Sequence, residues 1–303
     1  MLAAAVMLAV VGAGILVAEE APASKPALAA TVGSAEITTG RIDQIFSKQT
    51  VPPDAKPEDI KRFKQMLLSR LVGSELLHAY LEANKVVCPP EDVDKIKKEV
   101  EKAAVARKMS MEDLMAAAGL TMSGLEDAAK QQKLMAAATS DAQADAYIKT
   151  HPAYFNGTKV QASHILIACS PLGSTEEQKA AIKKLEGIAE DIKSNKVTFA
   201  AAATLHSSCP SKAKGGDLGE FGFESMVPPF AKAAFDTPVG SLTGVVRTQF
   251  GFHLIKVTEK KEGKDTPGAD ARTVAKNAIQ SDIENQVFDQ ALTSCPIVIH
   301  AMP

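Results

Sequence analysis

The sequence predicts an α+β protein. A small domain, with an antiparallel sheet and surrounding helices, is inserted between an all-helical domain and a C-terminal helix that packs back on the helical domain. Residues 38–150 place apolar side chains at spacings of three and four, which is typical of helices. The composition changes near Val160, where β-branched runs begin. The helix predicted over Arg272–Leu292 cannot bury its apolar stripe alone, so it is expected to return to the helical domain.

The expected domain boundaries follow these changes in pattern. They are 1–18 for a signal peptide or N-terminal anchor, 19–29 for a linker, 30–157 for the helical domain, 158–262 for the sheet domain, and 263–303 for a C-terminal helix and short strand that complete the helical domain.

Bulk composition limits the class of protein. The chain has 303 residues, enough for two domains with cores of their own. Its net charge is −2, and no cluster of Lys or Arg is visible. Because binding to a phosphate backbone needs concentrated positive charge, no nucleic-acid partner is expected.

The N-terminal segment Leu2–Ala18 is an unbroken apolar run. It is just short of the ~20 residues that span a bilayer, and it is typical of the apolar part of a secretory signal. Cleavage after Ala18 or Ala23 is the favoured interpretation. A retained anchor, which would tether the protein to a membrane, and a buried helix are the alternatives. The run therefore indicates an exported protein, periplasmic or associated with the cell envelope.

The cysteines leave two interpretations open. The chain has four cysteines, Cys88, Cys169, Cys209 and Cys295. Because the number is even, they could form disulfides in an exported chain, or they could stay as four thiols. Their wide spacing matches no metal-binding pattern. No metal and no cofactor are expected.

The helical domain is predicted to open with an extended segment, Ala30–Ile37, that turns at Gly33-Ser34. Thr38 or Thr39 caps the next helix. Five more helices are predicted in this domain. One has Pro57 in its first turn, a second covers Glu91–Lys108, and a third is capped by Ser110 with Asp113. The fourth covers Thr121–Ala138, and the fifth is capped by Ser140 with Gln143 and runs toward Lys149.

The inserted domain is predicted to begin with a strand over Val160–Ile167. The later elements are a helix capped by Thr175 with Gln178, a helix over Phe199–Leu205, a glycine-rich loop over Ser207–Phe221, a short helix from Pro228-Pro229, and strands over Val245–Arg247 and Phe252–Val257. Beyond this domain, Pro296–His300 is a candidate strand.

Single residues in this region carry little information alone. A histidine in a strand, such as His164 or His253, is more often a core residue than a catalyst. Cys209 could be a small apolar residue or a thiol nucleophile. The glycines of Gly215–Gly219 lack the Lys-Ser/Thr of a phosphate loop, so a tight turn is the better interpretation.

Together, four motifs in order resemble the parvulin family of peptidyl-prolyl cis/trans isomerases. They are SHILI (163–167), SSCPSKAKGGDLGEF (207–221), MVPPFAKAAFDTPVGSLTGVV (226–246) and FGFHLIKV (250–257). The resemblance covers about a hundred residues. The flanking helices resemble, more weakly, the chaperone part of SurA- and PrsA-like exported foldases.

The resemblance implies a set of site residues. His164 and His253 match the two active-site histidines, and Cys209 matches the family's Cys/Asp position. The residues on the substrate side are Leu218, Met226 and Phe230 in the pocket for the proline ring, and Thr248 near the paired histidines. Phe250 is also placed on the substrate side, at a position where several family members have Ser or another residue. Phospho-selective relatives carry basic residues after the first histidine strand, whereas Ala168–Ser174 holds no Lys or Arg, so no phosphate specificity is expected.

The chemistry fits these residue types. Rotation about X–Pro faces a barrier of ~20 kcal/mol because a twisted amide loses resonance, and it breaks no bond. An apolar pocket and neutral polar groups could favour the twisted form. The expected function is isomerisation of X–Pro bonds in unfolded or newly exported polypeptides. The alternative is a non-catalytic holdase chaperone whose parvulin domain binds peptides but is poorly active.

Overall fold

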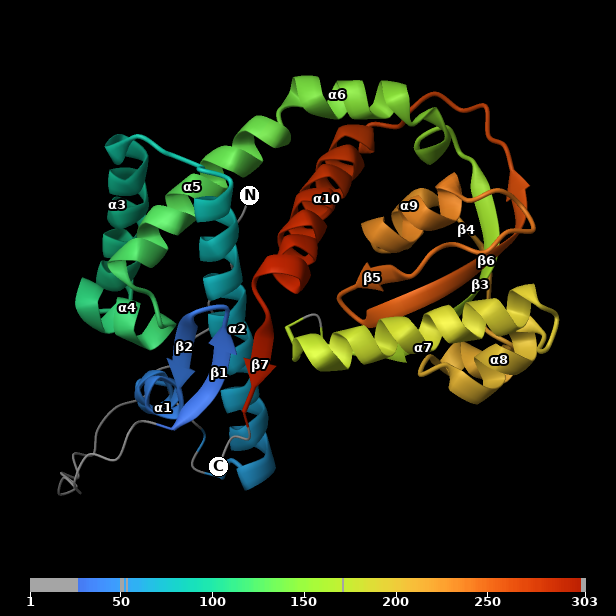
Figure 1. The fold of residues 1–303 in the computed structure, drawn as a ribbon. Helices are drawn as coiled ribbons and strands as arrows, with labels where there is room; N and C mark the ends of the chain where they lie inside the picture. The colour runs from blue at the N-terminus through green and yellow to red at the C-terminus, as the bar shows by residue number, and fades with distance from the viewer. Residues whose placement is uncertain (1–26, 50–51, 53, 171, 301–303) are drawn as a thin grey trace. The chain divides into compact units, whose positions relative to one another are not determined.

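The structure is a computed structural model that describes residues 27–49, 52, 54–170 and 172–300 (Figure 1). The predicted signal segment, Leu2–Ala18, lies outside the described residues, as does most of the linker. None of the helices that the structure describes has the length and apolar character needed to cross a membrane. The described chain divides into two units, 27–134 with 290–300 and 135–289, and each is treated by itself below.

The first unit combines helices with a small sheet. Its elements are β1 (Leu28–Val32), β2 (Ala35–Thr38), α1 (Thr39–Ser47), α2 (Pro57–Ala83), α3 (Pro90–Ala106), α4 (Met111–Ala118), the start of α5 (Met122–Ala138) and β7 (Ile297–Ile299). The strand order is β2-β1-β7, with both pairs antiparallel. The predicted turn at Gly33-Ser34 therefore closes a hairpin, and the last strand pairs with the first described one.

Local capping chemistry starts these helices where the sequence predicts. The Thr38 side chain accepts a hydrogen bond from the Arg41 backbone N–H at the start of α1. Pro57 occupies the first turn of α2, where its missing N–H costs nothing. Ser110 caps α4 by accepting from the Asp113 N–H at 3.0 Å. The helix α2 contributes Leu67, Leu68, Leu71, Leu76 and Leu81 to the core of this unit, together with residues of β1, β2, α1, α4 and α5.

The second unit is built around a four-stranded sheet. Its elements are α6 (Asp141–Thr150), η1 (Pro152–Tyr154), β3 (Lys159–Ala168), α7 (Thr175–Lys193), α8 (Phe199–His206), η2 (Pro210–Lys214), β4 (Asp217–Phe221), η3 (Phe223–Ser225), α9 (Pro228–Asp236), β5 (Val246–Thr248), β6 (Gly251–Lys261) and α10 (Ala271–Ser294). The strand order is β4-β3-β6-β5, and every neighbouring pair is antiparallel. This confirms the α+β class and the antiparallel sheet.

Alternation along β3 and β6 gives this sheet two different faces. On one face, Ile165 and Leu254 are buried against α7 and α8. On the other face, Ala162 and Ile255 belong to a core that contains α9. Figure 1 shows α7 and α8 on one side of the β3–β6 pair and α9 on the other. The even-numbered residues of β3 and the odd-numbered residues of β6 therefore face α9.

Two local predictions for this unit were wrong. The helix α7 is capped by Ser174 rather than Thr175, because the Ser174 hydroxyl accepts from the Glu177 N–H while the Glu177 carboxylate accepts from the Ser174 N–H. The end of the predicted glycine-rich loop forms β4, which pairs with β3 at the sheet edge. A short edge strand that contains a glycine shows little of the alternation by which strands are recognised.

The helix α10 differs from the expectation that it packs on the N-terminal helices. Ala271, Ala275 and Ala278 are buried in the same core as Phe155 and α9. Small alanine side chains let α10 approach this core closely, and ion pairs to α6 hold it there. Arg272 binds Asp145 at 2.6 Å, and Lys276 binds Asp141 at 2.6 Å. Most of α10 therefore belongs to the unit that holds the four-stranded sheet.

Candidate active site

The two predicted histidines come together on the α9 face of the sheet. His164 lies on β3 and His253 on β6, where their neighbours in register are Ile255 and Leu166 respectively. Both side chains point to the same face, so the rings meet diagonally across the strand pair. Their centroids are 5.3 Å apart with an interplanar angle of 21°. Both residues are buried.

A line of hydrogen bonds joins the histidines to Thr248. The two Nδ1 atoms are 3.1 Å apart, and Thr248 Oγ1 lies 2.8 Å from His253 Nε2. Thr248 Oγ1 also accepts from the Phe250 N–H at 3.1 Å. Its hydroxyl proton is therefore free to be donated to His253, which would leave His253 Nδ1 as the donor to His164. The far nitrogen of His164, Nε2, is buried without a partner among the described residues.

Burial keeps both histidines neutral. Desolvation lowers the pKa of His164 to about 4. Desolvation also lowers the pKa of His253 to about 3, and the neighbouring charge of His164 adds to this effect. One proton on each neutral ring suffices for the hydrogen bonds described, so the site offers polar groups without a net charge at neutral pH.

Phe230 forms an apolar wall against both rings. It is buried in α9 and meets His164 edge-on at 5.5 Å and His253 at 5.4 Å between centroids. Leu218 on β4 and Met226 after η3 are half-buried and pack against the same core. These three predicted pocket residues therefore border one apolar cluster beside the histidine pair.

Phe250 occupies a different environment from the other apolar site residues. It lies in the turn between β5 and β6 and is 54% exposed. Its backbone is tied to Thr248, whose hydroxyl binds His253. An exposed aromatic ring held two residues from Thr248 is available to a ligand rather than to the core.

The loop that carries Cys209 is anchored to β3. Ser207 Oγ accepts hydrogen bonds from the backbone N–H groups of Leu166, at 3.1 Å, and of Cys209, at 3.2 Å. The Ser208 N–H donates to the carbonyl of Leu166 at 2.7 Å. Cys209 is half-buried, and all four cysteines are free in the structure. These bonds hold the Cys209 segment beside the strand that bears His164.

Gly216 brings the other end of that loop against His164. Its carbonyl accepts from the His164 N–H at 2.9 Å. Its φ is +86°, and a Cβ at this position would overlap the carbonyl oxygen of His164. Glycine is required here both by the backbone angle and by the close approach to β3.

Two residues at the site carried no recognised signal in the sequence. Ser207 anchors the Cys209 loop through its hydroxyl, yet a serine before Ser208 reads as ordinary loop. Arg247 is a buried arginine on β5, next to Thr248. The sequence signal for its burial is its place in VVRT, a short β-branched segment that predicts a buried strand, where a charged side chain is unusual.

The small α+β domain thus holds a buried pair of neutral histidines beside an aromatic wall, with a cysteine loop tethered to β3. Residues 164–259 match the rotamase family, described as the PPIC-type PPIASE domain. A peptidyl-prolyl cis-trans isomerase Pin1 of Arabidopsis thaliana is 40% identical over 113 residues, which cover 33% of this chain and 95% of that protein. The chain therefore belongs to the PpiC-type, or parvulin, family of peptidyl-prolyl isomerases.

Longer relatives match over a smaller share of their length. Foldase protein PrsA 4 of Bacillus cereus is 38% identical over 136 residues, 45% of this chain and 44% of that protein. Chaperone SurA of Shigella dysenteriae is 40% identical over 113 residues, 37% of this chain and 26% of that protein. The chain thus spans less than half of these foldase and chaperone relatives.

Solved structures include a PpiC-type peptidyl-prolyl cis-trans isomerase domain, which is 26% identical and covers 36% of this chain and 95% of that one, with a TM-score of 0.33.

Proposed function

We propose that this chain is an enzyme that catalyses cis/trans isomerisation of X–Pro bonds in unfolded or newly exported polypeptides. The observation that carries the proposal is the buried, neutral His164–His253 pair, held by Thr248 and faced by Phe230. The pair lies within the segment that matches the isomerase family. The resemblance to foldases and chaperones supports protein clients rather than small molecules.

The proposed mechanism is preferential binding of the twisted amide. In this state the imide bond has lost its resonance, and charge at its oxygen and nitrogen differs from that of either planar form. Leu218, Met226 and Phe230 would hold the proline ring through apolar contact. The neutral histidines would position polar atoms near the twisting bond, without transferring a proton. Cys209 would line the site, and Phe250 would contact the client from its exposed position.

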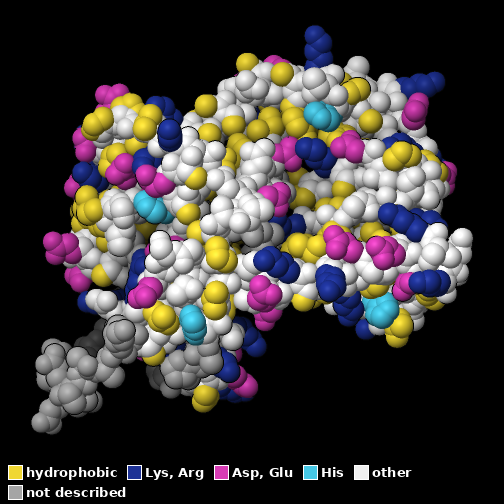
Figure 2. All heavy atoms as spheres, viewed as in Figure 1, with side chains coloured by type: hydrophobic (Ala, Val, Ile, Leu, Met, Phe, Trp, Pro, Cys, Tyr) yellow, Lys and Arg dark blue, Asp and Glu magenta, His cyan; other side chains and the backbone are white. Residues whose placement is uncertain are grey.

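Clients without phosphate are proposed. The segment Ala168–Ser174, after the first histidine strand, contains no Lys or Arg to pair with a phosphate. On the face of the molecule shown in Figure 2, basic and acidic side chains are interspersed. The choice of client would then depend on its proline and on contacts with the residues beside it, rather than on charged groups of the client.

An exported location is part of the proposal. Its support is the apolar run Leu2–Ala18, which has the character of a secretory signal, and the likeness to SurA- and PrsA-like proteins. We favour an exported protein from which this run is cleaved, and which acts in the periplasm or at the cell envelope. If the run is retained, it would tether the protein to a membrane. N-terminal sequencing of the secreted, mature protein would distinguish the two.

The experiment that tests the activity is catalysed isomerisation of an Ala-Pro peptide by the full chain and by its Thr248→Val variant. Valine has nearly the shape of threonine but removes the hydroxyl that binds His253. We expect the native chain to accelerate isomerisation and the variant to lose about tenfold or more in kcat/KM, the effect of losing one hydrogen bond to a polar site group.

A second variant, Thr150→Val, provides the matched control. Thr150 is an exposed residue of α6 whose hydroxyl bonds to the carbonyls of Ala146 and Tyr147. The same chemical change at Thr150 should leave kcat/KM unaltered. A folded native chain without catalysis on any X–Pro peptide would refute the proposed activity.

A further inference from the structure

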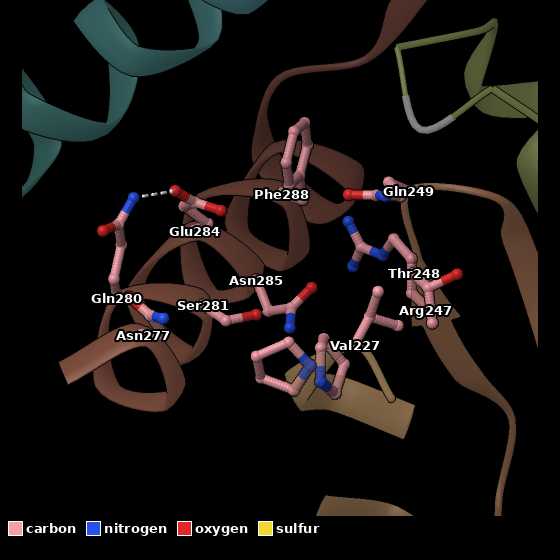
Figure 3. A pocket seen from close by; sticks show the side chains of 12 residues that line it. Val227, Arg247, Thr248, Gln249, Asn277, Gln280, Ser281, Glu284, Asn285 and Phe288 are labelled. Carbon is pink, nitrogen blue, oxygen red and sulfur yellow. Dashed lines mark hydrogen bonds between the residues drawn. The ribbon is translucent and has the colours of Figure 1, made fainter. Parts of the chain in front are cut away.

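A cavity of about 450 Å³ lies in the unit formed by residues 135–289, beside the candidate active site. It is bounded by β5, by the start of α9 and by one face of α10 (Figure 3). Among its lining residues, Thr248 is the one to which a role in the active site is assigned above, through its hydrogen bond to His253. The helix α10 lies outside the segment that matches the isomerase family, so this cavity is built partly from elements added to the isomerase domain.

The cavity adjoins the candidate active site, because the two share a wall residue. Thr248 lines it and also holds His253. Val227 lines it and directly follows Met226, one of the residues proposed to hold the proline ring. A polypeptide bound beside Met226 therefore has the cavity within reach of its neighbouring residues.

Arg247 is the most unusual residue of the cavity wall. Its side chain is 9% exposed and points from β5 toward α10 (Figure 3). Asp289 pairs with Nη2, and the guanidinium lies 5.4 Å from the ring centroid of Phe288. Nε and Nη1 have no hydrogen-bond partner among the described residues. Because buried donors without partners cost free energy, an acceptor that reached these two atoms from the cavity would remove that cost.

The remaining lining identifies what kind of acceptor fits. Asn277, Gln280 and Asn285 present amide groups, which both donate and accept, from α10. Val227, Pro228 and Pro229 supply an apolar wall. Glu284, which is the one carboxylate among the described residues of the lining, is exposed and accepts from Gln280.

Charge argues against an anionic ligand. The carboxylate of Glu284 already lies in the cavity, and that of Asp289 already pairs with Arg247. A second anion beside Arg247 would meet two negative groups. A neutral ligand with regularly spaced carbonyls and N–H groups, such as an extended polypeptide backbone, satisfies the arginine and the amides together.

We propose that this cavity is a second subsite for the client, in which the backbone on one side of the isomerised X–Pro bond lies between β5 and α10. Arg247 donates to a backbone carbonyl oxygen of that segment, and the amides of α10 bind the neighbouring peptide groups. This inference rests on the proposed isomerase function and adds a length of client that the enzyme holds. The recognition is independent of client sequence, as a foldase requires.

The test is the dependence of catalysis on peptide length, measured with the full chain. Binding energy from a remote part of a substrate raises kcat/KM when it is realised in the transition state. We expect an Ala-Pro peptide extended by several residues on one side to exceed the short peptide about tenfold in kcat/KM, the equivalent of one charge-assisted hydrogen bond. Extensions on each side are assayed separately.

Three variants of α10 locate the effect. Ser281→Leu fills part of the cavity and Asn285→Ala removes an amide from it, so both should reduce the long-to-short ratio toward one. Gln286→Ala is the control, since Gln286 is exposed and does not line the cavity. Turnover of the short peptide by each variant reports whether the catalytic site is still assembled.

Each outcome decides the matter. A native chain that turns over short and long peptides equally overturns the subsite and leaves the isomerase function intact, as does a ratio that survives Ser281→Leu. If no peptide is turned over, the isomerase function fails, and fluorescence anisotropy of a labelled long peptide then decides the subsite. Binding about tenfold weaker in Ser281→Leu than in Gln286→Ala supports it, and equal binding overturns it.

Discussion

Met226 and Phe230 differ in burial, and this difference decides which of them is the better probe of the proline pocket. Phe230 is 3% exposed and belongs to the core shared by the sheet and α9, whereas Met226 is half-buried at its edge. Truncation of Phe230 to alanine would cost about 3–5 kcal/mol of stability, so lost activity would be confounded with unfolding.

Met226→Ala is therefore the sharper substitution. We expect kcat/KM for an X–Pro peptide to fall about fivefold, the equivalent of ~1 kcal/mol of lost apolar contact, with a similarly small loss of stability. Ile182→Ala is the control, because Ile182 is half-buried on the opposite face of the sheet. Equal effects of the two substitutions on kcat/KM would contradict the pocket assignment.

The histidine pair makes stability depend on pH in a defined direction. Burial lowers the pKa of His164 to about 4 and of His253 to about 3, from 6.5. Between these values and 6.5, the unfolded chain binds more protons than the folded chain, so stability rises with pH. We expect the free energy of unfolding of this unit to decrease as the pH falls below about 6.5, with the loss continuing toward pH 4.

Urea titrations followed at pH 7.5, 5.5 and 4.5 would measure this decrease, with His164→Gln as the comparison that removes one titrating ring. Since neither histidine titrates between pH 6 and 8, kcat/KM should be constant over that range. A pronounced step in kcat/KM near pH 6.5 would mean that one of the rings has an ordinary pKa, against the burial argument.

At the scale of elements, the contact between β3 and the Cys209 loop depends on Gly216. We expect Gly216→Ala to destabilise the unit by roughly 2 kcal/mol or more, because the substitution adds both an unfavourable φ and an overlap with the His164 carbonyl. Thermal unfolding, with the resulting change in peptide turnover, would measure this effect.

Gly219 offers a matched comparison within the same segment. Its φ is +69°, yet nothing lies within 4 Å of a Cβ built there. Gly219→Ala should cost about 1 kcal/mol, the conformational part alone. Equal costs at the two positions would show that contact with β3 contributes nothing.

Elements with strong local signals could be predicted from the sequence. Thr38, Ser110 and Ser140 cap helices as expected, because a hydroxyl and an N–H three residues later form a purely local bond. The strand β4 could not be predicted, since it exists through pairing with β3 rather than through its own propensity. The shift of the α7 cap by one residue reflects two adjacent hydroxyl residues, Ser174 and Thr175, of which sequence alone cannot choose one.

At the scale of the molecule, the sequence predicted two domains but not which of them α10 packs against. An amphipathic stripe shows that a helix is buried on one side, and it does not show against what. The choice is made by small residues, Ala271 and Ala275, and by ion pairs of Arg272 and Lys276 with α6. The burial of Arg247 could not be predicted either, because that side chain is covered by α10, whose packing partner the sequence does not reveal.

The strand β7 permits a test of the first unit alone. Ile297 is 3% exposed and pairs with Val32, whereas its neighbour Val298 is 47% exposed. We expect Ile297→Ala to destabilise this unit by about 2–4 kcal/mol and to accelerate hydrogen exchange of β1 amides, with β3 amides and peptide turnover unchanged. Val298→Ala is the control. Slower turnover in Ile297→Ala would show that the two units are energetically coupled.

The pairing of β1 with β7 has a consequence for the order of events during synthesis. Ala30 pairs with Ile299, so the central strand of the first sheet waits for a partner that follows the isomerase unit in the sequence. The isomerase sheet instead closes between β3 and β6, both made before that partner appears. Because loop closure over a longer chain comes later, the isomerase unit should be folded while the first unit is still incomplete. During synthesis or export, the isomerase unit would then be folded while the sheet of the first unit still lacks its edge strand β7.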